Sequence, residues 1–183
     1  MHQMNKKNIE NYIFSLKNSN GGFYLQKNFN QTTLMSSAFS IITLELVDSL
    51  NKVEITKEQN YFLKYQDEKT GFFVDPNLNL DSKKIEDIEL NYIHYQTTAF
   101  SLSALDALGM KTKYNFTFLN AFRGKEKILK FFKKIDWRNP WHESNKIMFL
   151  LQFFSYEYIV IEKEDSLDDI YTILDCLDSA QDS

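Results

Sequence analysis

The sequence predicts an all-α protein built of repeated helical hairpins in two layers. Three observations support this fold class. Apolar residues recur at the spacing of amphipathic helices through most of the chain. The 183 residues include only 5 Gly and 2 Pro, so long elements with few breaks are expected. Strongly apolar segments alternate with amphipathic ones, as they do when buried inner helices alternate with half-exposed outer helices.

The first helical pair precedes residue 51. Residues 6–17 place apolar side chains at i, i+3, i+4 and i+7, which predicts an amphipathic helix that stops at the breaker Gly21-Gly22. Residues 33–50 are apolar almost all round. A helix of this kind is normally buried on all sides, so we expect it in the inner layer.

The second pair repeats this order around a longer connection. Residues 56–66 are amphipathic, and Thr56 with Gln59 three residues later has the spacing of a capping box. A polar loop over 72–91 leads to residues 94–108, which form a small-residue and mostly buried helix. The pair therefore again consists of an outer and an inner helix.

The last third adds a third pair and a final helix. Residues 125–135 form a basic amphipathic helix, and residues 143–160 form a strongly apolar one. The final helix, capped by Ser166, lies in the acidic C-terminal segment 162–183, which has eight acidic residues and one lysine. The basic helix either binds an anionic ligand, exposes its lysines to solvent, or docks the acidic segment of opposite charge. We expect one α/α-hairpin domain over 1–183.

Internal repetition supports the hairpin arrangement. Residues 36–41, SSAFSI, align with residues 97–102, TTAFSL. The run FLKYQ over 62–66, followed by Gly71-Phe72-Phe73, resembles the Gln-x(2–5)-Gly-x-aromatic repeat of squalene and hopene cyclases and of protein prenyltransferase β-subunits. The run FSLKNSNGGFY over 14–24 is similar, with Lys17 near the position of the Gln. The resemblance implies part or all of an α/α toroid over about 15–110, with a looser third unit.

The chain departs from these families in its chemistry. The Asp-x-Asp-Asp acid of the cyclases has no counterpart, and Cys176, the single cysteine, lies in an outer helix away from any zinc-ligand pattern. We therefore predict neither a metal nor a cofactor. The predicted helices are too few for a closed toroid of these families, so the chain is a fragment, a half-toroid that dimerises, or an open array.

The candidate site lies where the inner helices begin. In a toroid these helix N-termini face the central pocket, and the side chains there include acid–base groups. The candidate catalytic residues are His142, Glu143, Tyr95 and His94. The candidate ligand-binding residues are Trp137, Arg138, Trp141, Asn145 and Gln96, most of them in the distinctive segment 136–145. The alternative is structural: the histidines are polar residues of the rim, and the two tryptophans anchor the segment to its neighbouring helix.

Two functional hypotheses follow. In the first, a cyclase- or prenyltransferase-like module binds a small apolar or glycan ligand in an aromatic-lined pocket, with or without catalysis. In the second, a non-enzymatic α-solenoid assembles as a homodimer or with a partner chain. The net charge of −4 and pI near 5.4 argue against nucleic acid as the partner. No apolar stretch predicts a membrane span, and the single cysteine suits a reducing, cytoplasmic environment.

Overall fold

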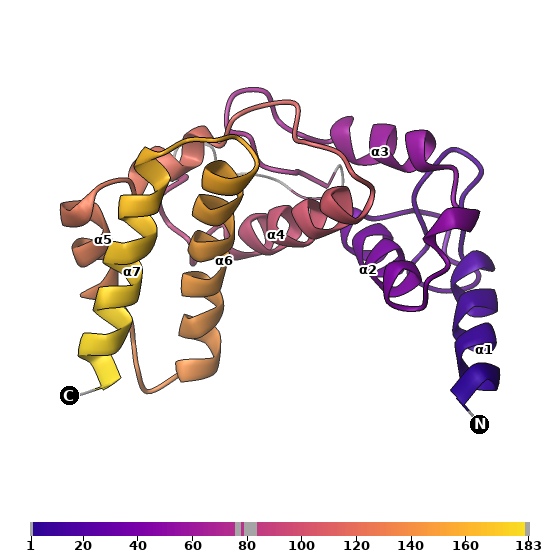
Figure 1. Ribbon diagram of the computed structural model, residues 1–183, viewed down its shortest axis with the longest axis horizontal. Helices are drawn as coiled ribbons and strands as arrows, with labels where there is room; N and C mark the ends of the chain where they lie inside the picture. Colours follow the sequence, from indigo (N-terminus) through magenta and orange to yellow (C-terminus); the bar gives the residue numbers. More distant parts are fainter. Residues whose placement is uncertain (1, 76–77, 79–83, 182–183) are drawn as a thin grey trace. The chain divides into compact units, whose positions relative to one another are not determined.

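The described part of the chain is helical, which confirms the predicted all-α class (Figure 1). The computed structural model describes residues 2–75, 78 and 84–181. These residues form seven α-helices and two 3₁₀ helices and no strands. The α-helices are α1 (His2–Phe14), α2 (Leu34–Leu46), α3 (Ile55–Leu63), α4 (Tyr92–Ala107), α5 (Lys125–Phe132), α6 (Pro140–Ile159) and α7 (Asp165–Gln181), and the 3₁₀ helices are η1 (Leu50–Lys52) and η2 (Thr117–Ala121).

The chain divides into two compact units. Unit 1 consists of residues 1–80 and 100–115, and unit 2 of residues 81–99 and 116–183. The boundary falls within α4, whose first half packs in unit 2 and whose second half packs in unit 1. Unit 2 contains the larger part of the predicted site residues, together with α5, α6 and α7.

Helix ends differ from the sequence predictions for local reasons. The helix predicted over 33–50 ends at Leu46, because Asp48 takes a left-handed conformation with φ of 49° and breaks the helical path. The capping box is present, but at Thr33 and Ser36 of α2 rather than at Thr56, where the prediction was wrong. The helix predicted from 143 begins earlier, at Pro140, whose fixed φ suits the first helical position.

The two repeated turns of unit 1 have equivalent backbone geometry. Lys17 pairs with Phe23 in an isolated antiparallel bridge, and Gln66 pairs with Phe73 in the same way. The amide side chain of Gln66 also donates to the carbonyl oxygen of Gly71 and to that of Tyr114. Its oxygen accepts the backbone N–H groups of Lys113 and Tyr114 at 2.8 and 2.9 Å. The side chain of Gln66 therefore joins its own turn to residues 113–114 by hydrogen bonds.

The first turn is held by buried polar side chains. The N–H of Gly22 donates to Oε2 of Glu58 at 2.7 Å, and the N–H of Phe23 donates to Oγ of Ser37 at 2.9 Å. Ser36 donates its hydroxyl to the carbonyl of Phe23. Burial raises the pKa of Glu58, and the hydrogen bond from Gly22 and the charge of Lys17 oppose that rise. Ser36 and Ser37 of α2 thus hold the first turn against this helix by hydrogen bonds.

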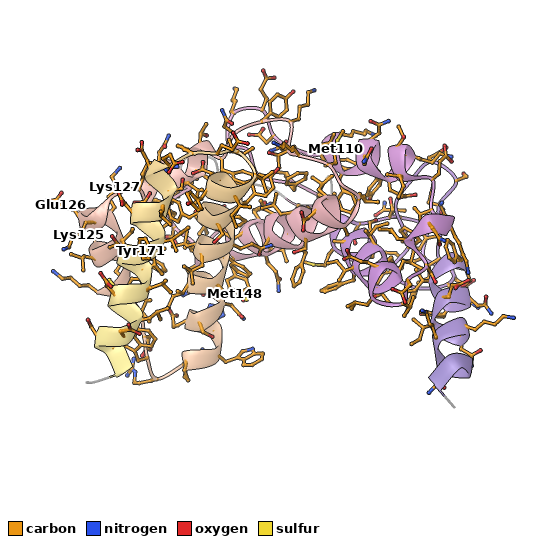
Figure 2. The ribbon with its side chains drawn as sticks, viewed as in Figure 1. Met110, Lys125, Glu126, Lys127, Met148 and Tyr171 are labelled. Carbon is orange, nitrogen blue, oxygen red and sulfur yellow. The ribbon has the colours of Figure 1, made fainter. Side chains whose placement is uncertain are left out.

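The apolar helices are not buried on all sides, contrary to the sequence prediction. In unit 1, α2 leaves Phe39 and Leu46 exposed, and Leu46 keeps 79% of its surface. In unit 2, α6 leaves Met148 and Ile159 exposed, and Figure 2 shows Met148 on the side of α6 away from α7. The remaining faces of both helices are buried. Each of these two helices therefore keeps one uncovered apolar stripe, which the residue pattern alone cannot distinguish from a core face.

Candidate functional site

Four charged or titratable side chains meet at the start of α6 in unit 2, and we call them the α6 cluster: Glu89, His142, Glu143 and Lys146. The ammonium of Lys146 lies 2.6 Å from Glu89 Oε2 and 2.7 Å from Glu143 Oε1. Nε2 of His142 lies 3.0 Å from Glu89 Oε2. Glu143 and Lys146 are buried, whereas Glu89 is exposed. The structure thus brings together two of the four predicted catalytic residues.

Aromatic packing fixes the orientation of the cluster. The imidazole of His142 stacks on the ring of Tyr92, with 4.7 Å between the ring centroids. Tyr92 also packs edge-on against Phe149 one to two turns further along α6. The predicted ligand-binding residue Asn145 donates its side-chain amide to the hydroxyl of Tyr92 at 3.0 Å. Tyr92 therefore links the first turns of α4 and α6 and restricts the rotation of His142.

The electrostatics of the cluster favour its charged form. Hydrogen bonds from Lys146 and His142 lower the pKa of Glu89 below its usual range. Burial acts to lower the pKa of Lys146, but the hydrogen bonds to Glu143 and Glu89 outweigh it and raise that pKa. Lys146 therefore stays protonated at neutral pH and does not serve as a general base.

Three members of the cluster have the atoms of a metal site. One ligand atom each from Glu89, His142 and Glu143 lies within 4.8 Å of the other two. Carboxylate and imidazole are suitable ligands for zinc and similar cations. The ammonium of Lys146, however, already contacts both carboxylates and supplies the positive charge that a cation would bring. The donor set fits an internal ion-pair network better than a metal centre.

The other two predicted catalytic residues, Tyr95 and His94, lie in the interior of unit 2. The Tyr95 hydroxyl donates to the carbonyl of Ile85, and its ring packs edge-on against Phe118. Burial raises the pKa of Tyr95 well above its usual value, with the nearby acids of the 86–87 segment adding to the rise. His94 is almost wholly buried. The structure therefore places both residues in the core, where packing and a hydrogen bond account for Tyr95.

The remaining predicted ligand-binding residues do not form one site. Arg138 pairs with Asp136 two residues away, with Nε 2.7 Å from Oδ1, and this pairing lowers the pKa of Asp136 to about 2. Trp141 projects from the first turn of α6 with 81% of its surface exposed. Gln96 is half-buried on α4. Trp137 lines the groove described below.

Sequence reasoning missed Lys146 and Glu89 of the α6 cluster and also Tyr92, which packs against it. Lys146 had a local signal, because it follows Glu143 by three positions on one helix, the spacing of an intrahelical ion pair. Glu89 and Tyr92 had none, because they lie more than fifty residues from their partners on α6 and meet them only through tertiary packing.

Removing the charge of Lys146 will destabilise unit 2. Lys146→Met leaves the buried carboxylate of Glu143 without its counter-ion, and we expect a loss of about 1–3 kcal/mol in the free energy of unfolding. Urea denaturation followed by circular dichroism measures this loss. Lys130→Met, at an exposed lysine of α5, is the matched control and is expected to change stability by less than about 0.5 kcal/mol. Equal effects of the two variants would show that the ion pairs of the cluster contribute nothing.

A groove of about 470 Å³ lies between α5 and α7, and we call it the α5/α7 groove. Its α5 side carries apolar side chains and two lysines, and its α7 side is mostly small and polar. The lining residues are Lys125, Leu129, Phe132, Lys133 and Trp137 on the first side, and Thr172, Asp175, Cys176, Ser179 and Ala180 on the second. Leu129 and Trp137 stay 39% and 45% exposed, so the apolar floor is open to solvent.

A buried ion network holds the two walls of the groove. Arg123 lies just before α5 and contacts Glu157 at 2.6 Å and Asp169 of α7 at 3.2 Å. The N–H of Gly124, the residue that precedes α5, donates to the other oxygen of Asp169 at 2.7 Å. The acidic C-terminal segment therefore docks through Arg123, which precedes the basic helix predicted over 125–135. The lysines of α5 take no part in it.

A second hollow, of about 550 Å³, lies in unit 1 beside the Gly21 turn. Its lining includes the side chains of Tyr61 and Tyr65, together with polar residues of α3 and the preceding turn. None of the predicted catalytic or ligand-binding residues lines it. The two hollows are thus formed by outer helices and turns.

Comparisons with family models, curated proteins and solved structures find no match to this chain. The resemblance to cyclases and prenyltransferase β-subunits therefore remains a prediction from the repeated turns. No helix among the described residues is long and apolar enough to cross a lipid bilayer.

Proposed function

We propose that this chain is a non-enzymatic helical-repeat interaction protein whose α5/α7 groove binds an acidic amphipathic helix of a protein partner. The observation that carries the proposal is the groove itself, with an open apolar floor between lysines. An amphipathic helix laid in such a groove buries its apolar face on the floor. Lys125 and Lys133 then favour acidic residues along the edges of that helix.

The alternative, acid–base catalysis at the inner helix ends, receives less support. Tyr95 and His94 are enclosed in the core, and the charges of Glu143 and Lys146 neutralise each other. The exposed apolar stripes of α2 and α6 add to the argument for an interaction protein, since uncovered apolar surface marks contact sites.

We also propose that the chain forms an open array of the helical hairpins found in α/α toroids. The equivalent bridges at Lys17 and Gln66 support repeated hairpins of the toroid kind, and the small number of helices supports an array that is not closed. We place the protein in the cytoplasm, a reducing compartment that suits its single cysteine.

A labelled synthetic helix tests the proposal. We expect a fluorescein-labelled amphipathic peptide of Leu, Ala and Glu to bind the protein, with anisotropy rising on titration. A peptide with the same apolar face and Lys in place of Glu is expected to bind at least about tenfold more weakly. Added salt should weaken the binding of the acidic peptide.

The matched variants locate the binding. Leu129→Asp puts a negative charge on the groove floor and should lower the affinity for the acidic peptide by at least about tenfold. Met148→Asp makes the same kind of change on the exposed stripe of α6 and should leave binding unchanged (Figure 2). The proposal fails if neither peptide binds, or if the two variants weaken binding equally.

A further inference from the structure

We propose that the natural occupant of the α5/α7 groove is helix α7 of a second copy of this chain, so that the protein forms a two-fold symmetric dimer. The inference rests on the proposed function, because it names the partner of the same groove. It is carried by charge complementarity between two neighbouring surfaces of unit 2.

The exposed surface of α5 is strongly basic. On α5 and the two residues that follow it, the one exposed acid is Glu126, and the exposed lysines are Lys125, Lys127, Lys130, Lys133 and Lys134. Figure 2 labels Lys125, Glu126 and Lys127, which form the first turn of α5. None of the five lysines takes part in an ion pair with another described residue. This charge is available for a partner.

The exposed surface of α7 is acidic to a matching degree. It carries Asp165, Asp168, Asp175 and Asp178, and none of them is ion-paired within the part of the chain that the structure describes. The acid of α7 that is ion-paired within the described chain is instead the buried Asp169, which contacts Arg123. Four unpaired acids on α7 therefore face outward beside the basic surface of α5, whose exposed residues sum to a charge of about four of the opposite sign.

Helix α7 also has the apolar face that an occupant needs. Tyr171 and Leu174 are 57% and 42% exposed, and they lie three residues apart on one side of the helix. Asp175 and Asp178 flank Leu174 on the same side. This face matches the required chemistry, which is an apolar stripe edged by carboxylates.

A two-fold axis uses both surfaces at once. In an isologous interface each contact occurs twice, so α7 of each copy enters the groove of the other and meets the lysines of its α5. Asp175 lines the groove and also borders the exposed face of α7. The donor and acceptor surfaces are thus continuous on one side of unit 2, as a symmetric dimer requires.

Sedimentation equilibrium with charge-reversed variants tests the dimer. We expect the wild-type chain to dimerise, and both Lys125→Glu/Lys133→Glu and Asp175→Lys/Asp178→Lys to weaken dimerisation by at least about tenfold. An equimolar mixture of the two variants should regain dimers, because each α5 then meets an α7 of opposite charge. Neither variant alone can regain them.

Matched controls separate the interface from net charge. Lys130→Glu/Lys134→Glu changes the same charge on α5 outside the groove lining, and Glu45→Lys/Glu68→Lys matches the second variant with exposed acids of unit 1. Both controls should weaken dimerisation much less than the groove variants, by no more than about threefold, because their side chains do not line the groove. Circular dichroism of every variant verifies that the helices form.

The outcomes distinguish this inference from the proposed function. A wild-type chain that stays monomeric while binding the acidic peptide overturns the dimer and leaves the groove function standing. A dimer that is insensitive to the groove charges, or that is not regained in the mixture, also overturns the inference. A monomer that binds no acidic peptide overturns both.

Discussion

Replacing Arg123 by Met will lower the free energy of unfolding of unit 2 by about 3–5 kcal/mol at pH 7. The guanidinium contacts the buried carboxylates of Glu157 and Asp169 and lies 5.4 Å from the ring centroid of Phe154. Methionine fills a similar volume but leaves Asp169 without an ion-pair partner among the described residues, and Glu157 with Lys163 alone, whose ammonium lies 3.4 Å from Glu157 Oε1. An uncompensated buried charge costs more than the original pair contributes.

The defect is expected to depend on pH. Burial already raises the pKa of Asp169, against the opposing hydrogen bond of Gly124 and the charge of Arg123. A carboxyl group whose pKa is raised in the folded state binds its proton more tightly there than in the unfolded state. The stabilisation of the folded protein that this proton provides is lost as the pH rises through the folded-state pKa. Without Arg123 the rise is larger, so the difference between wild type and variant should grow from pH 4 to pH 7.

Urea denaturation at several pH values measures both effects. Lys130→Met, on the exposed side of α5, is the control and should stay within about 0.5 kcal/mol of the wild type at every pH. A loss for Arg123→Met that is small, or that is the same at pH 4 and pH 7, would contradict the role of the ion network in joining α5 to α7.

Replacing Gly22 by Ala will destabilise unit 1 by at least about 3 kcal/mol. Gly22 has a φ of 74°, and an added Cβ would lie 2.5 Å from Cζ of Tyr61 and 2.9 Å from Oγ of Ser37. The buried tyrosine ring cannot move aside freely, because Tyr61 packs against Phe62 and Tyr65. Relief of the clash would displace the N–H of Gly22 from Glu58.

Gly109→Ala separates steric from conformational cost. Gly109 has a similar φ of 67°, but a Cβ added there would have no neighbour within 4 Å, so only the backbone penalty of about 1 kcal/mol applies. Thermal and urea denaturation of both variants give the comparison. Equal losses at the two glycines would show that the close approach of Tyr61 and Ser37 to the turn is not maintained in solution.

The helical pattern was predictable because the faces of a helix repeat at a fixed spacing. The alternation of amphipathic and strongly apolar segments identified all seven α-helices, and the repeated runs around Lys17 and Gln66 identified two turns of equivalent geometry. The helix boundaries were predicted less accurately, as at Pro140, because the free energy of a capping interaction is about as large as that of one more helical turn.

The candidate site was predictable only where its residues are neighbours along the chain. His142 and Glu143 do belong to one cluster, and Trp137 does line the groove. Tyr95 and His94 were assigned to the same site by their residue types, whereas packing places them in the core. Tyrosine and histidine side chains occur both in cores and in functional sites, so the residue type alone does not decide between these two environments.

The sequence by itself determined the helical class, the order of the helices and the residues of the two repeated turns, since each depends on contacts between near neighbours. The tertiary structure alone decided which apolar faces stay uncovered, on α2 and α6, and where α5 and α7 leave a groove. It also decided which charges are paired, as in Arg123 with Asp169 and Glu89 with Lys146. Burial and charge pairing are properties of segments that meet in space, and a residue carries the same side chain whether or not another segment covers it.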